Sequence, residues 1–468
     1  MAYQKEPLNL EMKDVVLVKP SKSIPSCILS LSTLDNKDNN YNLCQAVHVY
    51  RPSTIHDSDS GFDPCHVFKE ALSKALDYYY PLAGRIVRHA GDGRLRVEFG
   101  VGGAEYGVPF LEATANCTLS SLHYLDNTDT DIAKDLVLDV PSPQDKNYPL
   151  VFMVTKFICG GFTIGMGCSH VVCDGYGSIQ VFKAIIELVK GRSEPSVIPV
   201  WERERLVGAS TSTKQPLPPL LQPKEPIAFS PLVQPKTVIK IYCFKVENEV
   251  IKRLKMSLMK EGGSESEPVT TYESLGAYVW RSRARALQLS NNGKTMLNML
   301  VGIRRSMKGY DPLPIGYYGN TTVDGKVVLK VSELNEMPLY EIVKLIKEAK
   351  KIASSTDYVK NSIDHTPETE HKQDFSMDGS GAVTILTEWK HLGFVDENNI
   401  DFGGYESVNF VPAPCNMFAS LEGCIFASPG KLDDDDPSMK GGVKIFTSLP
   451  VAAMPRFKEE IEALRLLN

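Results

Sequence analysis

A histidine and an aspartate lie four positions apart in the segment Gly165-Met-Gly-Cys-Ser-His170-Val-Val-Cys-Asp174-Gly-Tyr-Gly177. An apolar, β-prone run precedes His170, glycines follow Asp174, and an amphipathic run begins at Ile179. This order predicts a strand that delivers His170 to a turn before a helix starts. A neutral imidazole at such a junction can accept a proton from a hydroxyl or an amine. His170 is therefore a candidate general base, although a half-buried histidine bonded to a backbone carbonyl would show the same pattern.

Two other chemistries are open to the same segment. Cys168 and Cys173 flank His170 and raise the option of a thiol nucleophile, which requires a lowered thiol pKa that no sequence feature predicts. His170 and Asp174 have the spacing of two metal ligands on a helix, but the glycines favour a turn and no third ligand lies nearby. The ten cysteines show no Cys-x-x-Cys spacing, which favours reduced thiols over zinc ligands or disulfides.

Motifs spread along the chain resemble those of one enzyme family. His-x-x-x-Asp-Gly after a strand resembles the signature of the BAHD acyltransferases, plant enzymes that transfer an acyl group from coenzyme A to an alcohol or amine. A peptide-synthetase condensation domain shares this spacing but usually carries a second histidine where Ser169 stands. Four other segments resemble further BAHD signatures in the family's order: Leu31-Ser-Thr-Leu-Asp35, Tyr79-Tyr-Pro-Leu-Ala-Gly84-Arg85, Pro314-Ile-Gly-Tyr-Tyr-Gly-Asn320 and Asp401-Phe-Gly-Gly-Tyr405.

The resemblance implies a mechanism for the central motif. His170 would accept the proton of the acceptor as that group attacks the thioester, without a covalent acyl-enzyme. Asp174 would point away from the reaction centre and pair with an arginine. This arginine is assigned to Arg304, with Arg305 as a competing assignment, because Gly302 replaces the aspartate of the family's Val-Asp-x-Arg pattern.

The last motif departs from the family's Asp-Phe-Gly-Trp-Gly. Asp401, Phe402 and Gly403 keep the pattern, and the resemblance implies that they support the structure and the coenzyme A site. Gly404 and Tyr405 replace the Trp and the Gly, which removes a large aromatic side chain unless Tyr405 fills its volume. We interpret this as altered packing with intact chemistry. The alternative is an acyltransferase-like protein with weak or no catalysis that binds a ligand.

Further residues are candidates for substrate contacts. Lys255 and Thr271 occupy segments that approach coenzyme A in relatives, although a solvated helix face and an N-cap would explain them equally well. Thr387 and Trp389 match a family segment near the active site, with Thr387 as a candidate donor to the developing oxyanion. The sequences of segments 199–208 and 316–320 resemble those of the family branch that acylates taxane diterpenoids, benzyl-type alcohols and spermidine-type polyamines.

Composition and charge describe an ordinary globular protein, with 43% hydrophobic and 23% charged residues. The formal net charge of −6 indicates neither a nucleic-acid partner nor an anionic membrane. Apolar runs such as 382–386 stop far short of the roughly 18 residues that a spanning helix needs, and the first residues lack a secretory signal. We therefore expect a cytoplasmic monomer with no metal and no cofactor. The resemblance implies acyl-CoA as co-substrate and a small-molecule alcohol or polyamine as acceptor.

The length of 468 residues predicts two domains. A Pro-rich, aperiodic linker at 191–235 separates an N-terminal domain, 1–190, from a C-terminal domain, 236–468, and a short segment near 380–400 is a candidate to pack with the former. Both halves mix strands and helices, which predicts an α/β protein. The resemblance adds a chloramphenicol-acetyltransferase-like fold with the active site in a channel between the domains. The acidic run 433–436 is predicted as a solvated loop, since it lacks the spacing of a calcium loop.

Periodicity and turn residues predict individual elements. The expected strands cover 42–50, 95–99, 149–158, 237–246, 407–410, 423–427 and 443–449. The expected helices cover 65–77, 248–260, 271–286, 338–352 and 454–467.

Overall fold

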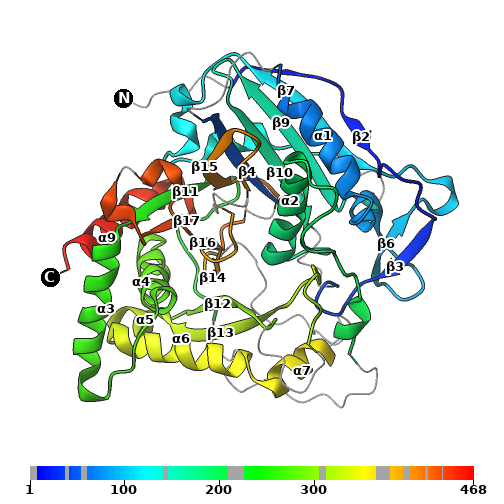
Figure 1. The fold of residues 1–468 in the computed structure, drawn as a ribbon. Coiled ribbons are helices and arrows are strands. Elements are labelled where there is room, and N and C mark those ends of the chain that lie inside the picture. Colours follow the sequence, from blue (N-terminus) through cyan, green and yellow to red (C-terminus); the bar gives the residue numbers. More distant parts are fainter. Residues whose placement is uncertain are drawn as a thin grey trace.

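The chain forms two α/β parts that lie side by side (Figure 1). One part contains a seven-stranded and a four-stranded sheet, and the other contains a six-stranded sheet. The predicted class, α/β with two sheet-and-helix domains, is confirmed. The computed structural model describes residues 8–36, 42–53, 61–140, 146–208, 226–304, 312–364, 380–394, 400–416, 420–434 and 436–467.

The seven-stranded sheet has the order β1-β7-β9-β10-β4-β15, and β2 pairs with β7. Two packed helices, α1 (Pro64–Ala75) and α2 (Gly175–Val189), cover one of its faces, where Phe68 and Phe182 join the core. Every residue of β10 is buried, as is typical of a strand covered on both faces. The strands are β1 (Leu10–Met12), β2 (Val16–Val18), β4 (Leu43–Pro52), β7 (Val108–Ala115), β9 (Leu150–Phe157), β10 (Phe162–Ser169) and β15 (Tyr405–Pro412).

The four-stranded sheet lies at the edge of the same part, with the order β3-β6-β5-β8 (Figure 1). Its strands alternate buried and half-buried residues, for example in β6, which indicates one covered face. Its strands are β3 (Cys27–Ser30), β5 (Arg85–Arg88), β6 (Leu95–Phe99) and β8 (Lys146–Asn147).

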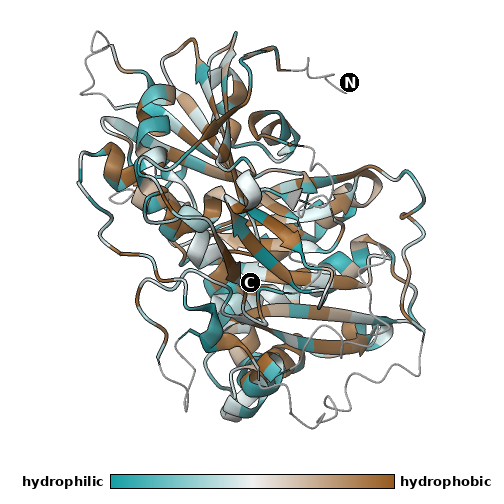
Figure 2. Ribbon diagram, turned by 90° about the vertical axis from the view of Figure 1, so that its right-hand side faces the viewer, coloured by the Kyte–Doolittle hydropathy of each residue, from teal (hydrophilic) through white to brown (hydrophobic). Residues whose placement is uncertain are grey.

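The six-stranded sheet has the order β11-β17-β16-β14-β12-β13. Helices pack their apolar stripes on it: in α6, for example, Ile342, Val343 and Ile346 are buried in a second core. Figure 2 shows the hydrophobic residues concentrated in the strands. The strands are β11 (Ile239–Val246), β12 (Lys294–Gly302), β13 (Thr322–Lys330), β14 (Val383–Glu388), β16 (Gly423–Ala427) and β17 (Val443–Pro450). The helices are α3 (Asn248–Gly262), α4 (Thr271–Ala286), α5 (Val331–Glu336), α6 (Leu339–Ala353), α7 (Thr356–Asp364) and α9 (Met454–Arg465). None of the helices in the described ranges is long and apolar enough to cross a membrane.

One strand from the second half of the chain belongs to the first sheet. β15 pairs antiparallel with β4, so Phe410 lies opposite His48. The preceding strand β14 pairs with β12 and β16 in the six-stranded sheet. Within the expected crossing segment 380–400, β14 therefore belongs to the second part, whereas Trp389 and Phe394 contribute to the core of the first. The strand from the second half of the chain that joins the first sheet, β15, lies just beyond this segment.

An ionic cluster joins the two parts. Asp433 lies 2.6 Å from the Lys245 ammonium and 3.0 Å from the Lys444 ammonium, and Asp126 lies 2.6 and 3.0 Å from the same two groups. The side chains of Asp433 and Lys444 are only 3% and 2% exposed. The prediction of a solvated acidic loop is therefore wrong for Asp433, because its carboxylate is buried against two cations. Asp434 and Asp436 are exposed, and Asp435 lies outside the described residues.

Candidate active site

His170 directly follows β10, and Asp174 begins the next helix, as the sequence predicts. The Asp174 side chain caps α2 by accepting a hydrogen bond of 2.8 Å from the Gly177 amide. A Cβ at Gly177 would lie only 2.0 Å from the Tyr318 carbonyl oxygen, so this turn packs against the backbone of another segment. The glycines after Asp174 thus allow a close approach between α2 and the chain just before β13.

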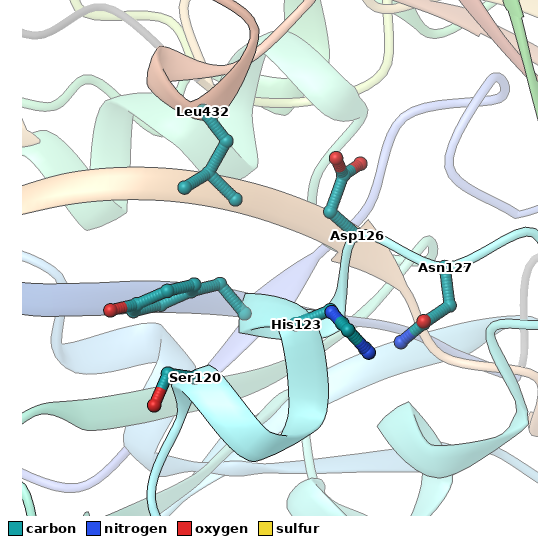
Figure 3. A pocket seen from close by; sticks show the side chains of 6 residues that line it. Ser120, His123, Asp126, Asn127 and Leu432 are labelled. Carbon is teal, nitrogen blue, oxygen red and sulfur yellow. The ribbon is translucent and has the colours of Figure 1, made fainter.

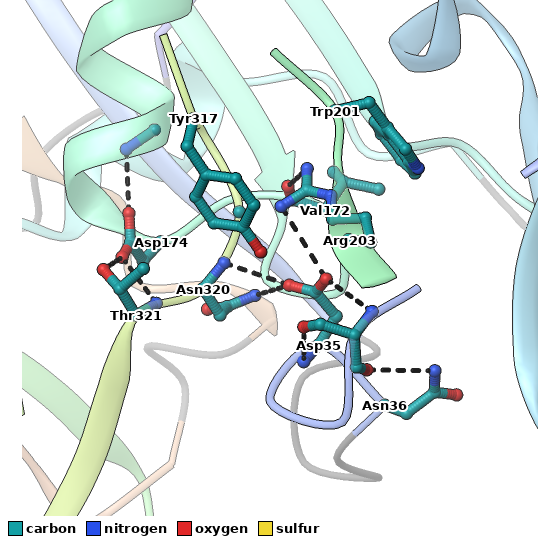
Figure 4. A network of polar contacts seen from close by, with 12 residues as sticks. Asp35, Asn36, Val172, Asp174, Trp201, Arg203, Tyr317, Asn320 and Thr321 are labelled. Atoms are coloured by element: carbon teal, nitrogen blue, oxygen red, sulfur yellow. Dashed lines mark hydrogen bonds and ion pairs between the residues drawn. The ribbon is translucent and has the colours of Figure 1, made fainter. Parts of the chain in front are cut away.

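That approaching segment holds the imidazole of His170. The Asn320 side-chain oxygen lies 3.2 Å from His170 Nδ1, and its Nδ2 donates to the His170 carbonyl oxygen over 2.5 Å. Asn320 is held in turn by Asp35, whose Oδ1 accepts from the Asn320 amide at 3.0 Å and from Nδ2 at 2.8 Å (Figure 4). The three residues come from parts of the chain far apart in sequence.

Arg203 contacts Asp35 in turn and completes this support. Its Nη1 lies 3.7 Å from Asp35 Oδ2, its Nη2 donates to the Val172 carbonyl at 2.8 Å, and its guanidinium stacks over Trp201 at 4.2 Å (Figure 4). Both charged side chains are essentially inaccessible, at 1% and 0%. Burial acts to lower the pKa of Arg203, but Asp35 and the neighbouring tyrosines outweigh it, and the net pKa is raised. A Cβ at Gly319 would lie 1.2 Å from Arg203 Nη1, so a larger residue there would displace the guanidinium from this position.

Asp174 is also bonded to the residue that follows Asn320. Its Oδ2 accepts from the Thr321 amide at 3.1 Å and from the Thr321 hydroxyl at 2.9 Å. Arg304 Nη2 lies 3.6 Å from the same oxygen, as the resemblance implied, and also donates to the Gly319 carbonyl. The shortest contacts of Asp174 are therefore the cap at Gly177 and the two donors of Thr321, with Arg304 as a more distant ion-pair partner. Arg305 lies outside the described residues.

The thiols beside His170 have the wrong character for a nucleophile. Cys168 and Cys173 are buried in the core of the first part. Burial, together with the neighbouring Cys168, raises the pKa of Cys173 well above its ordinary value. A nucleophilic cysteine needs the opposite shift.

Three of the candidate substrate residues, Lys255, Thr271 and Thr387, lie on the second part, whereas the Trp389 ring belongs to the core of the first. Lys255 is half-buried on α3, and burial together with the Lys390 charge lowers its pKa. Thr270, and not Thr271, is the N-cap of α4. Thr387 is half-buried on β14, and the Trp389 ring packs on Phe394 and Phe410 at 5.3 and 5.7 Å.

The altered motif forms the tight turn that leads into β15. Gly403 and Gly404 have φ values of 50° and 95°, which favour glycine, and Phe402 forms a bridge with Tyr405 across the turn. Asp401 accepts from the Ser407 amide at 3.1 Å. The Tyr405 ring lies 5.0 Å from both Phe62 and Phe162, so this position keeps an aromatic side chain in the core.

A surface pocket of about 390 Å³ lies elsewhere, on the first part near the ionic cluster (Figure 3). No predicted site residue lines it, and neither does any residue of the network around His170. We therefore do not assign the chemistry to this pocket. Its lining residues are Ser120, His123, Tyr124, Asp126, Asn127 and Leu432.

Sequence reasoning missed the residues that support His170. Asp35 and Asn320 end two of the motifs quoted for the family resemblance, so the signal was available, but their contact could not be derived from spacing. Arg203 lies inside the stretch predicted as a Pro-rich linker, 191–235, of which the structure describes 191–208 and 226–235. Its burial and its contact with Asp35 show that this stretch contributes a buried side chain to the site.

The fold of two α/β parts is shared with TRI101 of F. sporotrichioides, whose structure was solved in complex with coenzyme A and T-2. That solved structure superposes with a TM-score of 0.70 at 16% identity, covering 94% of this chain and 99% of TRI101. The chain belongs to the Transferase family, whose model matches residues 8–464 and which the motifs predicted as the BAHD acyltransferases.

Relatives agree with this assignment. The chain is 40% identical over 459 residues to spermidine sinapoyl-CoA acyltransferase of Arabidopsis thaliana, with 98% of each chain covered. It is 32% identical over 466 residues to taxadien-5-alpha-ol O-acetyltransferase of Taxus chinensis, again with 98% of each covered. The predicted branch is confirmed, and the protein is an acyl-CoA-dependent O- or N-acyltransferase.

Proposed function

We propose that this enzyme transfers an aromatic acyl group from its coenzyme A thioester to an amine of a spermidine-type polyamine, with His170 as general base. The observation that carries the proposal is the 40% identity, over 98% of both chains, to an enzyme named for spermidine and sinapoyl-CoA. The taxane relative, at 32%, makes an alcohol acceptor the weaker candidate.

In the proposed reaction, the acceptor nitrogen attacks the thioester carbonyl carbon while the His170 imidazole takes the N–H proton. The tetrahedral intermediate collapses with cleavage of the C–S bond, and the imidazolium returns the proton to the coenzyme A thiolate. No covalent acyl-enzyme forms, because the thioester is already activated. Thr387, on β14, is the proposed donor to the oxyanion.

The coenzyme A end of the substrate is proposed to approach α3 and the end of β14. Burial, and in addition repulsion by the Lys390 charge, lower the pKa of Lys255. A phosphate placed between the two ammonium groups would relieve this repulsion. Thr271, at the start of α4, and Trp389, beside Lys390, are proposed neighbours of the same substrate. The predictions of a monomer and of a cytoplasmic location stay predictions.

Asp174, Arg304, Asp401, Phe402 and Gly403 are proposed to act on the structure around the reaction, and not on the substrate. The alternative of a non-catalytic ligand-binding protein depended on the loss of an aromatic at position 404. The contacts of Tyr405 with Phe62 and Phe162 argue against such a loss.

Release of free thiol by purified protein tests the proposal. Acetyl-, benzoyl-, coumaroyl- and sinapoyl-CoA are each combined with spermidine or with a panel of alcohols. We expect spermidine-dependent thiol release with the aromatic donors and an amide product in mass spectrometry. The variant His170→Ala should lose at least roughly 10²–10⁴-fold in kcat. Turnover with alcohols alone would contradict the amine acceptor, and equal rates of wild type and variant would contradict the role of His170.

A further inference from the structure

The orientation of the Asn320 side chain is set by the groups around it. Nδ2 faces Asp35 Oδ1 at 2.8 Å and the His170 carbonyl oxygen at 2.5 Å. Both of these oxygens accept hydrogen bonds, so an exchange of the amide nitrogen and oxygen would place three acceptors against one another. The hydrogen-bond network therefore assigns Nδ2 to this side and Oδ1 to the side of the imidazole.

This orientation has a consequence for His170. Asn320 Oδ1 lies 3.2 Å from His170 Nδ1 and can only accept, so Nδ1 must be the protonated nitrogen of a neutral imidazole. The other nitrogen, Nε2, then carries the lone pair. We propose that Asn320 is a positioning residue that selects the Nδ1–H tautomer of His170 and leaves Nε2 to take the proton of the acceptor. The inference rests on the proposed function for its catalytic meaning, but the tautomer itself can be observed without turnover.

Asp35 is arranged to keep Asn320 in this orientation. Its Oδ1 accepts from the backbone and side chain of Asn320, and its Oδ2 accepts from the Ser32 amide at 3.0 Å and faces Arg203 at 3.7 Å. Donors at both oxygens suit a carboxylate that only accepts. Arg203 thus fixes the Asp35 carboxylate, Asp35 fixes the Asn320 amide, and Asn320 fixes the His170 imidazole.

In this arrangement, charged groups stabilise the loops around His170, and a neutral group contacts its imidazole. The charged groups around the His170 turn, which are Asp35, Arg203, Asp174 and Arg304, contact one another, Asn320, Thr321 or backbone groups, and His170 Nδ1 contacts the neutral amide of Asn320. A neutral partner fixes the tautomer without the full charge of a directly bonded carboxylate. The same logic operates in serine proteases, where the group at Nδ1 sets the tautomer of the catalytic histidine.

Imidazole nitrogen NMR tests the tautomer directly. Protein labelled with ¹⁵N in its histidine rings is compared with the His170→Ala variant, which identifies the His170 signals by their loss. At a pH where His170 is neutral, we expect a protonated Nδ1 and an unprotonated Nε2. A protonated Nε2 in the wild type overturns the inference, whatever the activity of the protein.

Kinetics of Asn320→Ala test the catalytic consequence. We expect kcat to fall roughly 10²-fold, with little change in KM for either substrate, because the base loses its tautomer and orientation while the substrates keep their contacts. Asn36→Ala is the matched control: Asn36 is a buried asparagine in the loop of Asp35 that bonds to Ser32 and Leu95. Its kcat should be unchanged.

The outcomes separate the two proposals. If the wild type shows no His170-dependent turnover, the proposed function fails, and the NMR experiment still decides the tautomer. If the wild type is active and Asn320→Ala keeps its kcat, or Asn36→Ala loses as much, the positioning role is overturned. Should Asn320→Ala fail to fold, the wild-type ring spectrum alone decides.

Discussion

Two histidines on the first sheet are held in opposite ways. His170, after β10, contacts the amide of Asn320 and lies within a network of hydrogen bonds and buried charges. His48, on the neighbouring strand β4, stacks on Phe182 with ring centroids 4.0 Å apart and lies 4.7 Å from Phe410. Within the described residues, its Nδ1 has no hydrogen-bond partner.

The two surroundings produce different chemistry from the same side chain. Burial lowers the pKa of His48 to about 3, so this imidazole stays neutral at ordinary pH and acts as one ring of an aromatic cluster. The polar surroundings of His170 instead orient a half-buried ring that can meet a substrate. We define the aromatic cluster by these residues, in which Phe68 connects the rings around His48 with those around Tyr405: His48, Tyr50, Phe62, Phe68, Phe162, Phe182, Phe394, Phe402, Tyr405 and Phe410.

The comparison predicts how each region responds to a lost side chain. A polar network depends on individual atoms, since the removal of one partner leaves a buried charge or donor unpaired. An aromatic cluster depends on filled volume, which a neighbouring residue can supply. In this chain Asp35, Asn320, His170 and Asp174 of the polar network match the family motifs, whereas the Asp401–Tyr405 turn departs from its motif.

The largest effect is expected from Arg203→Ala. It removes the cation beside the fully buried Asp35 and should lower the free energy of unfolding by about 3–5 kcal/mol. Arg205→Ala is the control, because Arg205 pairs with Glu202 at the surface and should cost at most about 1 kcal/mol. Urea denaturation followed by circular dichroism gives both values. Equal costs would contradict the importance of the buried pair.

A smaller effect is expected from Tyr405→Ala in the aromatic cluster. Loss of this buried ring should lower the free energy of unfolding by about 3 kcal/mol. The ratio kcat/KM should stay near the wild-type value in the surviving folded enzyme, because the ring packs on Phe62 and Phe162 and not on the His170 network. Tyr405→Phe keeps the ring and should cost less than about 1.5 kcal/mol. A large loss of kcat with unchanged stability would place this turn in the catalytic machinery.

The sequence predicted the elements whose pattern is local. Regular apolar spacing located α3, α4 and α6, and turn residues bounded β6 and β16 at the observed residues. The adjacent strands β12 and β13 were missed, because β12 is rich in Met and Leu and β13 carries Asp324, Gly325 and Lys326 at its centre. Neither composition favours a strand on its own, and both are stabilised by their mutual pairing.

The same distinction between local and distant contacts applies to the site. His170 and Asp174 share one turn and were found from their spacing. The bonds from Asn320 to Asp35 span 285 positions, and the contact with His170 spans 150. Such contacts are created by the meeting of β13, the crossover stretch and the loop before β4, so a single sequence does not contain their geometry. The role of Arg203 was even harder to predict from the sequence, because the residues around it have the composition of a linker.

The smallest expected effect is the change in the free energy of unfolding with pH that His48 causes. It also distinguishes the two histidines most directly. In the unfolded chain His48 binds a proton below its ordinary pKa of about 6.5, whereas the folded protein keeps it neutral down to about 3. The unfolded state therefore binds more protons as the pH falls through this window, and stability falls with it, by about 2 kcal/mol at pH 5. His48→Phe keeps the stacked ring and removes the titration. We expect the stability difference between variant and wild type to grow in favour of the variant from pH 7.5 to 5, as measured by urea denaturation. If the stability difference between variant and wild type stays constant with pH, His48 takes up a proton in the folded protein as readily as in the unfolded chain. A polar group would then reach this imidazole despite the aromatic rings around it.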